Sequence, residues 1–241
     1  MSSTNHIKAV FFDLDGTLRH SVPEGGEVFT AYVASLGLRV NQQDRLRAMR
    51  WEYNYWASSA DLRDDLLAHS SDTENFWIEY SRRRLIALGA SSAWALELAP
   101  KASAHMGEMY KPESIVPEDV RRMLPPLKQA GYIMAVISNR DRPFQDTLDS
   151  HGLSEFFSYS LAGGEVDSYK PEPGIFEHAL KQMNVSAPET VYVGDNYFAD
   201  VVGARRAGLQ PVLYDPNLIF PEADCTTIRS FDELIPVIQA L

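Results

Sequence analysis

The chain has little cysteine, little positive charge and no long apolar run, and each shortage excludes a class of protein. It has 241 residues and one cysteine, Cys225, so no disulfide can form within the chain. Lys and Arg number 22 against 33 Asp and Glu, a net charge of −11, which argues against nonspecific binding to nucleic acid. No apolar run approaches membrane-spanning length, and residues 1–7 lack the apolar core of a signal peptide. We expect a cytoplasmic monomer or homodimer with no nucleic-acid and no membrane partner.

Two regions of the chain have the alternating pattern of an α/β protein. Short apolar runs predict strands, and amphipathic segments between them predict helices. The expected strands are 9–12, 132–137, 156–161, 190–193 and 211–214, and the expected helices are 118–130, 143–151, 173–183, 198–207 and 231–241. Strands that alternate with helices predict a parallel sheet with right-handed crossovers.

Strand signals stop between residues 27 and 110, after an irregular stretch at 18–26, and helical periodicity replaces them. We expect a helix over 42–69, broken near Ser58 and Ser59, and two more that begin near Ser71 and Ser91. The three arginines at 82–84 indicate a solvated face, with contact with an anionic substrate as the alternative. The aromatic residues of this insert indicate packing within a small helical domain, with stacking on a ring-shaped substrate as the alternative; they are Trp51, Tyr53, Tyr55, Trp56, Phe76, Trp77 and Tyr80.

The residues that carry chemistry follow the predicted strands. Asp13 and Asp15 come directly after the first strand, with Gly16 marking a turn. Ligands of open α/β sheets bind outside the carboxyl ends of strands, and two acids placed there need a cation, a proton or water. Polar residues also follow later strands and loops, namely Ser138, Asn139, Lys170, Asp195 and Asp200.

With these motifs in order, the chain resembles the haloacid dehalogenase-like hydrolase superfamily. The four matching segments are Asp13-Leu14-Asp15-Gly16-Thr17, Ser138-Asn139, Lys170-Pro171, and Gly194-Asp195 with Asp200. The resemblance implies a Rossmann-like α/β core over residues 1–18 and 113–241. It also implies that residues 19–112 are an inserted α-helical cap of the C1 type, which closes over the active site and helps to select substrates.

The resemblance implies a role for each motif residue. Asp13 would be the nucleophile that forms an aspartyl-phosphate. Asp15 would be the general acid and base, a role that favours a raised pKa. Lys170, Ser138 and Asn139 would bind the phosphoryl group, together with backbone N–H groups near Leu14 and Asn139.

The implied cofactor is Mg²⁺, because a carboxylate nucleophile and a phosphate monoester repel one another without a bridging cation. Its ligands would be Asp13, the backbone carbonyl of Asp15, Asp195 and Asp200, the last either directly or through the water shell. Simpler interpretations stay open for some residues. Ser138 suits a helix N-cap, and Asn139 suits a structural role. Asp200 suits a cap of the following helix or an ion pair with Arg205 or Arg206.

The residues also separate the reactions of this superfamily. Asp15 argues against a dehalogenase, whose branch typically lacks the second acid. No lysine lies between Lys8 and Lys101, which removes the usual Schiff-base lysine of a phosphonatase. We expect a phosphatase of a small phosphorylated metabolite, such as a nucleotide or sugar phosphate. The alternatives are a phosphomutase and a noncatalytic protein that binds a phosphorylated ligand or a partner. Arg19 and His20, directly after the first motif, are candidate substrate contacts.

Overall fold

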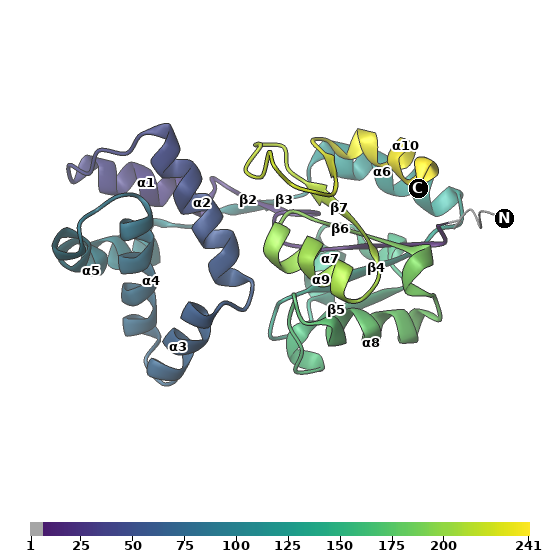
Figure 1. The fold of residues 1–241 in the computed structure, drawn as a ribbon, viewed down its shortest axis with the longest axis horizontal. Coiled ribbons are helices and arrows are strands. Elements are labelled where there is room, and N and C mark those ends of the chain that lie inside the picture. The colour runs from purple at the N-terminus through teal and green to yellow at the C-terminus, as the bar shows by residue number, and fades with distance from the viewer. Residues whose placement is uncertain (1–6) are drawn as a thin grey trace. The chain divides into compact units, whose positions relative to one another are not determined.

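The computed structural model describes residues 7–241 and divides into two compact units (Figure 1). One unit, the core, comprises the described residues up to His20 together with Ile115–Leu241, and the other, the insert, comprises Ser21–Ser114. The expected boundaries after residues 18 and 112 lie two residues before these ones. The predicted lack of a signal peptide concerned residues 1–7, of which residues 1–6 lie outside the described residues.

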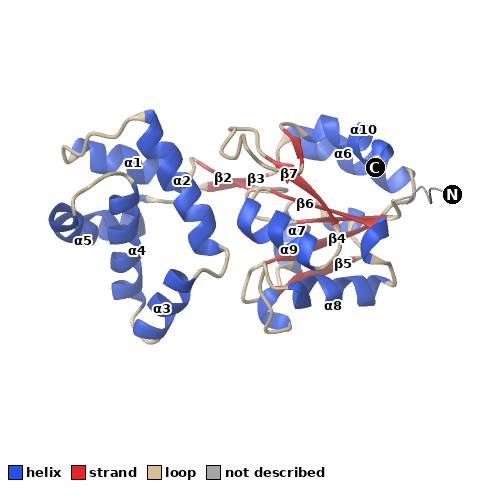
Figure 2. Ribbon diagram, viewed as in Figure 1, coloured by secondary structure: helices blue, strands red, loops and turns tan. Residues whose placement is uncertain are grey.

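The core is built on a six-stranded sheet in the order β5-β4-β1-β6-β7-β8, with every neighbouring pair parallel (Figure 2). The predicted α/β class is confirmed. The strands are β1 Ala9–Phe12, β4 Ile133–Ser138, β5 Tyr159–Ala162, β6 Thr190–Gly194, β7 Gln210–Tyr214 and β8 Thr226–Ile228. The edge strand β8 was not predicted, because its three residues carry too short an apolar pattern to be recognised.

Both faces of the sheet are covered by helices, as Figure 1 shows. Successive strand residues point to opposite faces, so Val10 and Phe12 belong to one hydrophobic cluster and Ala9 and Phe11 to the other. The first cluster includes residues of α6 Glu118–Gln129, α7 Gln145–Ser150 and α10 Leu234–Ala240. The second includes residues of α8 Pro173–Met183 and α9 Val202–Arg206. Burial on both faces explains why these strands read as continuous apolar runs.

The central position of β1 fixes where the site forms. Phe12 pairs with Val136 of β4 on one side and with Val193 of β6 on the other. The residues that follow these three strands therefore meet at one edge of the sheet. The strand order changes direction on the two sides of β1, the place where ligands bind in open α/β sheets.

Short helical turns complete the core. The predicted helix over 198–207 begins as a π-helical turn, Tyr197–Val201, before α9 continues it. The 3₁₀ turns are Ser154–Phe156, Gly163–Glu165, Ala187–Glu189 and Phe231–Glu233. The expected strand over 156–161 thus begins three residues later, after the first of these turns.

The insert consists of five helices among the described residues: α1 Gly25–Ser35, α2 Gln42–Trp56, α3 Ala60–Ala68, α4 Thr73–Ala87 and α5 Ser92–Met109. The predicted break between α2 and α3 is confirmed. Ser58 has a positive φ of 52°, and the Ser59 hydroxyl accepts a hydrogen bond from Leu62 N as the N-cap of α3. Asp72 and Ser91 cap α4 and α5 in the same way.

The aromatic residues of the insert pack on one another. Tyr55, Phe76 and Tyr80 are buried in one cluster, with Trp51 against it. Trp56 and Trp77 are 37% and 44% exposed at its edge. The packing interpretation therefore accounts for the buried rings of this cluster.

Two predictions for the insert and its junctions were wrong. Arg84 does not lie on a solvated face: it is buried, and its Nη1 lies 2.5 Å from Glu52 Oε1. The stretch at 18–26, expected to be irregular, contains β2 His20–Val22, which pairs with β3 Glu113–Ile115. Strands of three residues carry too little periodicity to be predicted, and this pairing joins segments far apart in the chain.

Candidate active site

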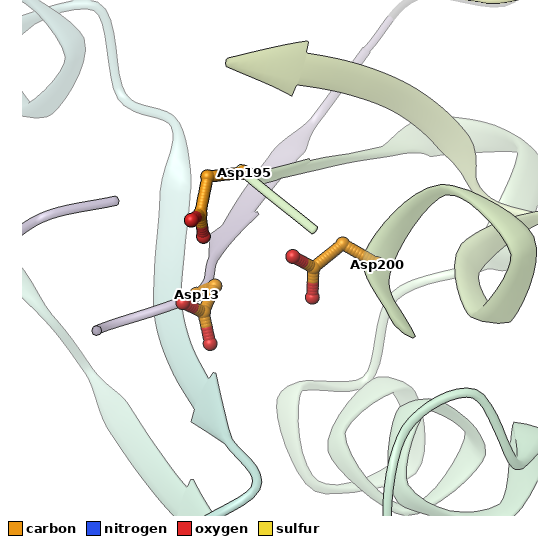
Figure 3. Close-up of side chains that lie close together, drawn as sticks. All are labelled: Asp13, Asp195 and Asp200. Atoms are coloured by element: carbon orange, nitrogen blue, oxygen red, sulfur yellow. The ribbon is translucent and has the colours of Figure 1, made fainter. Parts of the chain in front are cut away.

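Three carboxylates meet at the carboxyl edge of the core sheet (Figure 3). Asp13 follows β1, Asp195 follows β6, and Asp200 lies in the π-helical turn that comes next. One oxygen of each lies within 4.8 Å of the others. Asp13 and Asp200 are buried, and Asp195 is partly exposed. The parallel register of β1 and β6 is what brings residues 13 and 195 together.

The Lys170 ammonium lies between two of these carboxylates. Its Nζ donates to Asp13 Oδ1 at 2.6 Å, to Asp200 Oδ1 at 2.7 Å and to the Tyr192 hydroxyl at 3.0 Å. Lys170 is only 2% exposed, so all three donors of its ammonium are used inside the protein. Tyr192, which in turn donates to Ile137 O at 3.0 Å, was not predicted as a site residue. Its place in the middle of a buried strand gave no functional signal.

The electrostatics of the cluster favour a cation. Burial raises the pKa of Asp13 to about 7, with the charge of Asp200 acting in the same direction and Lys170 opposing it. Burial disfavours the charged form of Lys170, but Asp13 and Asp200 outweigh it and hold the pKa of Lys170 well above its ordinary value. The cluster holds one ammonium and three carboxylates, so it keeps an excess of negative charge. Oxygen ligands in this number suit a divalent cation such as Mg²⁺.

Two glycines allow the motif segments to approach each other. Gly16 has φ +90°, and a Cβ there would lie 2.3 Å from Asp195 Oδ2. A Cβ at Gly194 would lie 2.3 Å from Asp200 Oδ2. Thr17 then ties the two motifs together, since its hydroxyl donates to Asp195 Oδ1 at 3.0 Å and accepts from Asp195 N at 3.1 Å. Any side chain at either glycine would displace a carboxylate of the cluster.

Ser138 and Asn139 lie at the end of β4, on the other side of β1. Ser138 is the last residue of that strand and is buried. The Asn139 side chain clamps the backbone of Lys170, because its Oδ1 accepts from Lys170 N at 2.6 Å and its Nδ2 donates to Lys170 O at 2.9 Å. The Asn139 side chain therefore holds the Lys170 loop in place. Phosphate binding by Ser138 and by the Asn139 backbone N–H stays a prediction.

The carboxylate of Asp15 is not part of the three-acid group but pairs with two arginines. Arg140 donates to it from Nε and Nη2, at 2.7 and 2.9 Å, and Arg19 donates from Nη1. Burial raises the pKa of Asp15, but the hydrogen bonds and charges of Arg140 and Arg19 outweigh it and place that pKa below its ordinary value. The expectation of a raised pKa is wrong for this arrangement. Arg140 was missed because nothing in the sequence marks which acid a loop arginine will reach.

The alternative interpretation of Asp200 can be compared with the structure directly. Its Oδ1 lies on Lys170, and its Oδ2 accepts from Asn196 N at 2.9 Å. Arg205 pairs instead with Asp224, at 2.7 Å. Arg206 donates to Pro171 O at 3.4 Å. The contacts of these three residues therefore do not support the alternative in which Asp200 pairs with an arginine of α9.

Comparison with protein families decides the class of this protein. A family model described as haloacid dehalogenase-like hydrolase matches residues 7–208, which include every motif residue of the site. The chain belongs to this family. It is therefore a hydrolase, and the resemblance drawn from its motifs is confirmed.

Sequence relatives and a solved structure of the hydrolase family each match more than four fifths of this chain. A phosphoserine phosphatase of Thermus thermophilus is 30% identical, covering 88% of this chain and 90% of its own. A phosphoglycolate phosphatase of Vibrio cholerae is 29% identical, covering 84% and 81%. The crystal structure of a predicted phosphoglycolate phosphatase from Haemophilus somnus has a TM-score of 0.60 at 20% identity, covering 98% and 99%, and supports the fold. No helix within residues 7–241 is both long and apolar enough to cross a membrane.

Proposed function

We propose that this hydrolase is a Mg²⁺-dependent phosphatase of small phosphorylated metabolites. The observation that carries the proposal is the buried cluster in which Lys170 lies between Asp13 and Asp200, with Asp195 within 4.8 Å of both acids. The matches to a phosphoserine phosphatase and a phosphoglycolate phosphatase support the same reaction class. We also propose that the insert is the substrate-selecting cap implied by the resemblance, since it occupies the chain between β1 and β4.

Asp13 is the proposed nucleophile. A carboxylate oxygen of Asp13 attacks phosphorus, and the bond from phosphorus to the ester oxygen breaks. Asp15, which takes up a proton from solvent once it has left its arginines, gives that proton to the leaving alcohol. Water then attacks phosphorus and gives a proton to Asp15, while the bond between phosphorus and Asp13 breaks. Phosphate leaves, and both acids return to their starting state.

Other residues of the chain stabilise charge during these steps. Lys170 is placed to neutralise phosphoryl oxygens as they approach Asp13, and Ser138 and backbone N–H groups near Leu14 and Asn139 add hydrogen bonds. A Mg²⁺ ion held by Asp13, Asp195, Asp200 and the Asp15 carbonyl would offset the repulsion between nucleophile and substrate. Tyr192 and Asn139 act indirectly, because they hold the side chain and the backbone of Lys170.

The proposal is tested by phosphate release from a panel of phosphorylated metabolites and p-nitrophenyl phosphate, with Mg²⁺ and with chelator. The panel is run on the wild type, on Asp13→Asn and on Glu177→Gln, a control that removes an exposed carboxylate from α8. We expect Mg²⁺-dependent release from the wild type and the control, and none from Asp13→Asn. Release that persists in chelator, or in Asp13→Asn, would contradict the proposal. Isomerisation of a sugar phosphate without net release would indicate a mutase instead.

A further inference from the structure

The Asp15 carboxylate forms a bidentate ion pair with Arg140. The Nε and Nη2 atoms of Arg140 lie 2.7 and 2.9 Å from Oδ2 and Oδ1 of Asp15, and Arg19 also contacts Oδ1. This is the parallel arrangement in which a guanidinium recognises a carboxylate most specifically. The side chains stay accessible, with 30% of Arg140 and 38% of Asp15 exposed. A small anion from solvent is therefore able to reach the same donors.

Arg140 is fixed by contacts that do not involve Asp15. Its Nη1 donates to Thr147 Oγ1 at 3.1 Å, and its guanidinium lies 5.8 Å from the centre of the buried Phe144 ring. Asn139, the preceding residue, is anchored to Lys170. The Nε and Nη2 edge of Arg140 would therefore keep its direction if Asp15 rotated away.

The proposed reaction requires that rotation. As general acid, Asp15 must lie within hydrogen-bond distance of the ester oxygen that leaves. While Arg140 and Arg19 both bind the Asp15 carboxylate, it cannot donate a proton to the ester oxygen. When Asp15 turns to the ester oxygen, the Nε and Nη2 donors of Arg140 are left beside the alcohol part of the substrate. Charged donors left in this position would need a new anionic partner.

We propose that Arg140 and Arg19 form a carboxylate subsite for the alcohol part of the substrate. The substrate carboxylate replaces the Asp15 carboxylate on Nε and Nη2 of Arg140. This replacement frees Asp15 to turn toward the ester oxygen. Because Asp15 contacts both positions, the substrate carboxylate lies within a few bonds of the ester oxygen. The subsite thus selects short phosphorylated hydroxy acids. This inference rests on the proposed phosphatase function.

The test compares two substrates that differ only in the group the subsite would bind. Phosphoglycolate carries a carboxylate where 2-hydroxyethyl phosphate carries a neutral alcohol. We expect the wild type to prefer phosphoglycolate in kcat/KM, and Arg140→Gln to lower that preference about 10- to 100-fold, the range for a lost charged hydrogen bond. Arg140→Lys should lose most of the preference as well, since an ammonium lacks the two-point geometry.

The matched control is Arg142→Gln, which removes an exposed arginine from the same loop and should leave the preference unchanged. An equal loss in Arg142→Gln would overturn the proposal in favour of general electrostatic attraction. Equal loss of both substrates in Arg140→Gln would also overturn it, since Arg140 would then act only on fold or chemistry. Thermal unfolding of each variant shows whether it is folded.

Binding gives a second readout that does not depend on the leaving group. Glycolate should inhibit hydrolysis of p-nitrophenyl phosphate by the wild type, and about 10-fold more weakly in Arg140→Gln. Unchanged inhibition would contradict the subsite. If no compound releases phosphate with Mg²⁺, the proposed function itself fails. If p-nitrophenyl phosphate is hydrolysed but phosphoglycolate is not preferred over 2-hydroxyethyl phosphate, the phosphatase function stands and only the proposed subsite fails.

Discussion

Each unit of this protein buries a cation, but Arg84 of the insert pairs with one acid while Lys170 of the core lies among several. In the insert, the buried Arg84 pairs with Glu52. In the core, Lys170 faces Asp13 and Asp200, with Asp195 within 4.8 Å of both acids. A buried ion left without a partner is costly in free energy. The Arg84–Glu52 pair avoids this cost, whereas the unbalanced cluster of the core suits binding of a cation and an anionic substrate.

The largest expected effect is that of removing the nucleophile from the unbalanced cluster. Asp13→Asn should lower kcat by about four orders of magnitude or more, because an amide does not attack phosphorus. The melting temperature should stay unchanged or rise, because the change removes one of the like charges around Lys170. Both are measured in chelator and in Mg²⁺. A large fall in melting temperature would show that the core cluster is needed for stability, which is the behaviour expected of the Arg84–Glu52 pair in the insert.

Removal of the one cation of the core cluster should affect activity and stability together. Lys170→Met should lower kcat/KM about 10²- to 10³-fold by leaving phosphoryl charge uncompensated. It should also cost about 3 kcal/mol in the free energy of unfolding measured in chelator, because Asp13 and Asp200 lose their buried partner. Lys181→Met, at an exposed position in the last turn of α8, is the control. Near-normal kinetics of Lys170→Met would contradict its assigned role.

The balanced pair of the insert should behave in the opposite way. Arg84→Met should cost about 2 to 3 kcal/mol in the free energy of unfolding, at the low end for a broken buried pair because Glu52 is 29% exposed. Arg82→Met, on the same helix, removes only a partly exposed pair with Glu79 and should cost about 0.5 kcal/mol or less. Denaturant unfolding measures both. Equal effects of the two substitutions would mean that burial of Arg84 does not matter.

A smaller effect is expected at His20, the last core residue before the insert. Burial lowers the pKa of His20, more than Thr17 and Asp119 raise it, and its Nε2 is buried without a hydrogen-bond partner. The unfolded chain therefore takes up a proton near pH 6.5 that the folded protein does not. The stability that neutral His20 contributes is therefore present above about pH 6.5. It is lost as the pH falls from there through the pKa of His20 in the folded protein, which is lower.

Thermal unfolding at about pH 7.5 and about pH 5.5 checks this expectation. His20→Gln should lose less stability between the two pH values than the wild type does. A variant whose melting temperature depends on pH as steeply as the wild type would show that His20 is not the group responsible.

The sequence predicted most of the core because its signals are local. Continuous apolar runs such as Ala9–Phe12 are set by burial on both faces of the sheet, and the break between α2 and α3 is set by Ser58 and Ser59. The acids at the strand ends could also be predicted, because Asp13 and Asp195 directly follow apolar runs. The short strands β2, β3 and β8 escaped prediction, since three residues carry too little periodicity to be distinguished from loop.

Residue order alone determined the family, the α/β class and the acids that gather at the sheet edge, because these depend on local pattern and on the direction of parallel strands. Tertiary structure decided which charges pair. It placed Lys170 on Asp13, 157 residues away, and Arg140 on Asp15, 125 residues away. It also buried Arg84, which the sequence indicated as solvated. Partner choice depends on distances across the fold, and these arise only when the strands are paired and the helices are packed.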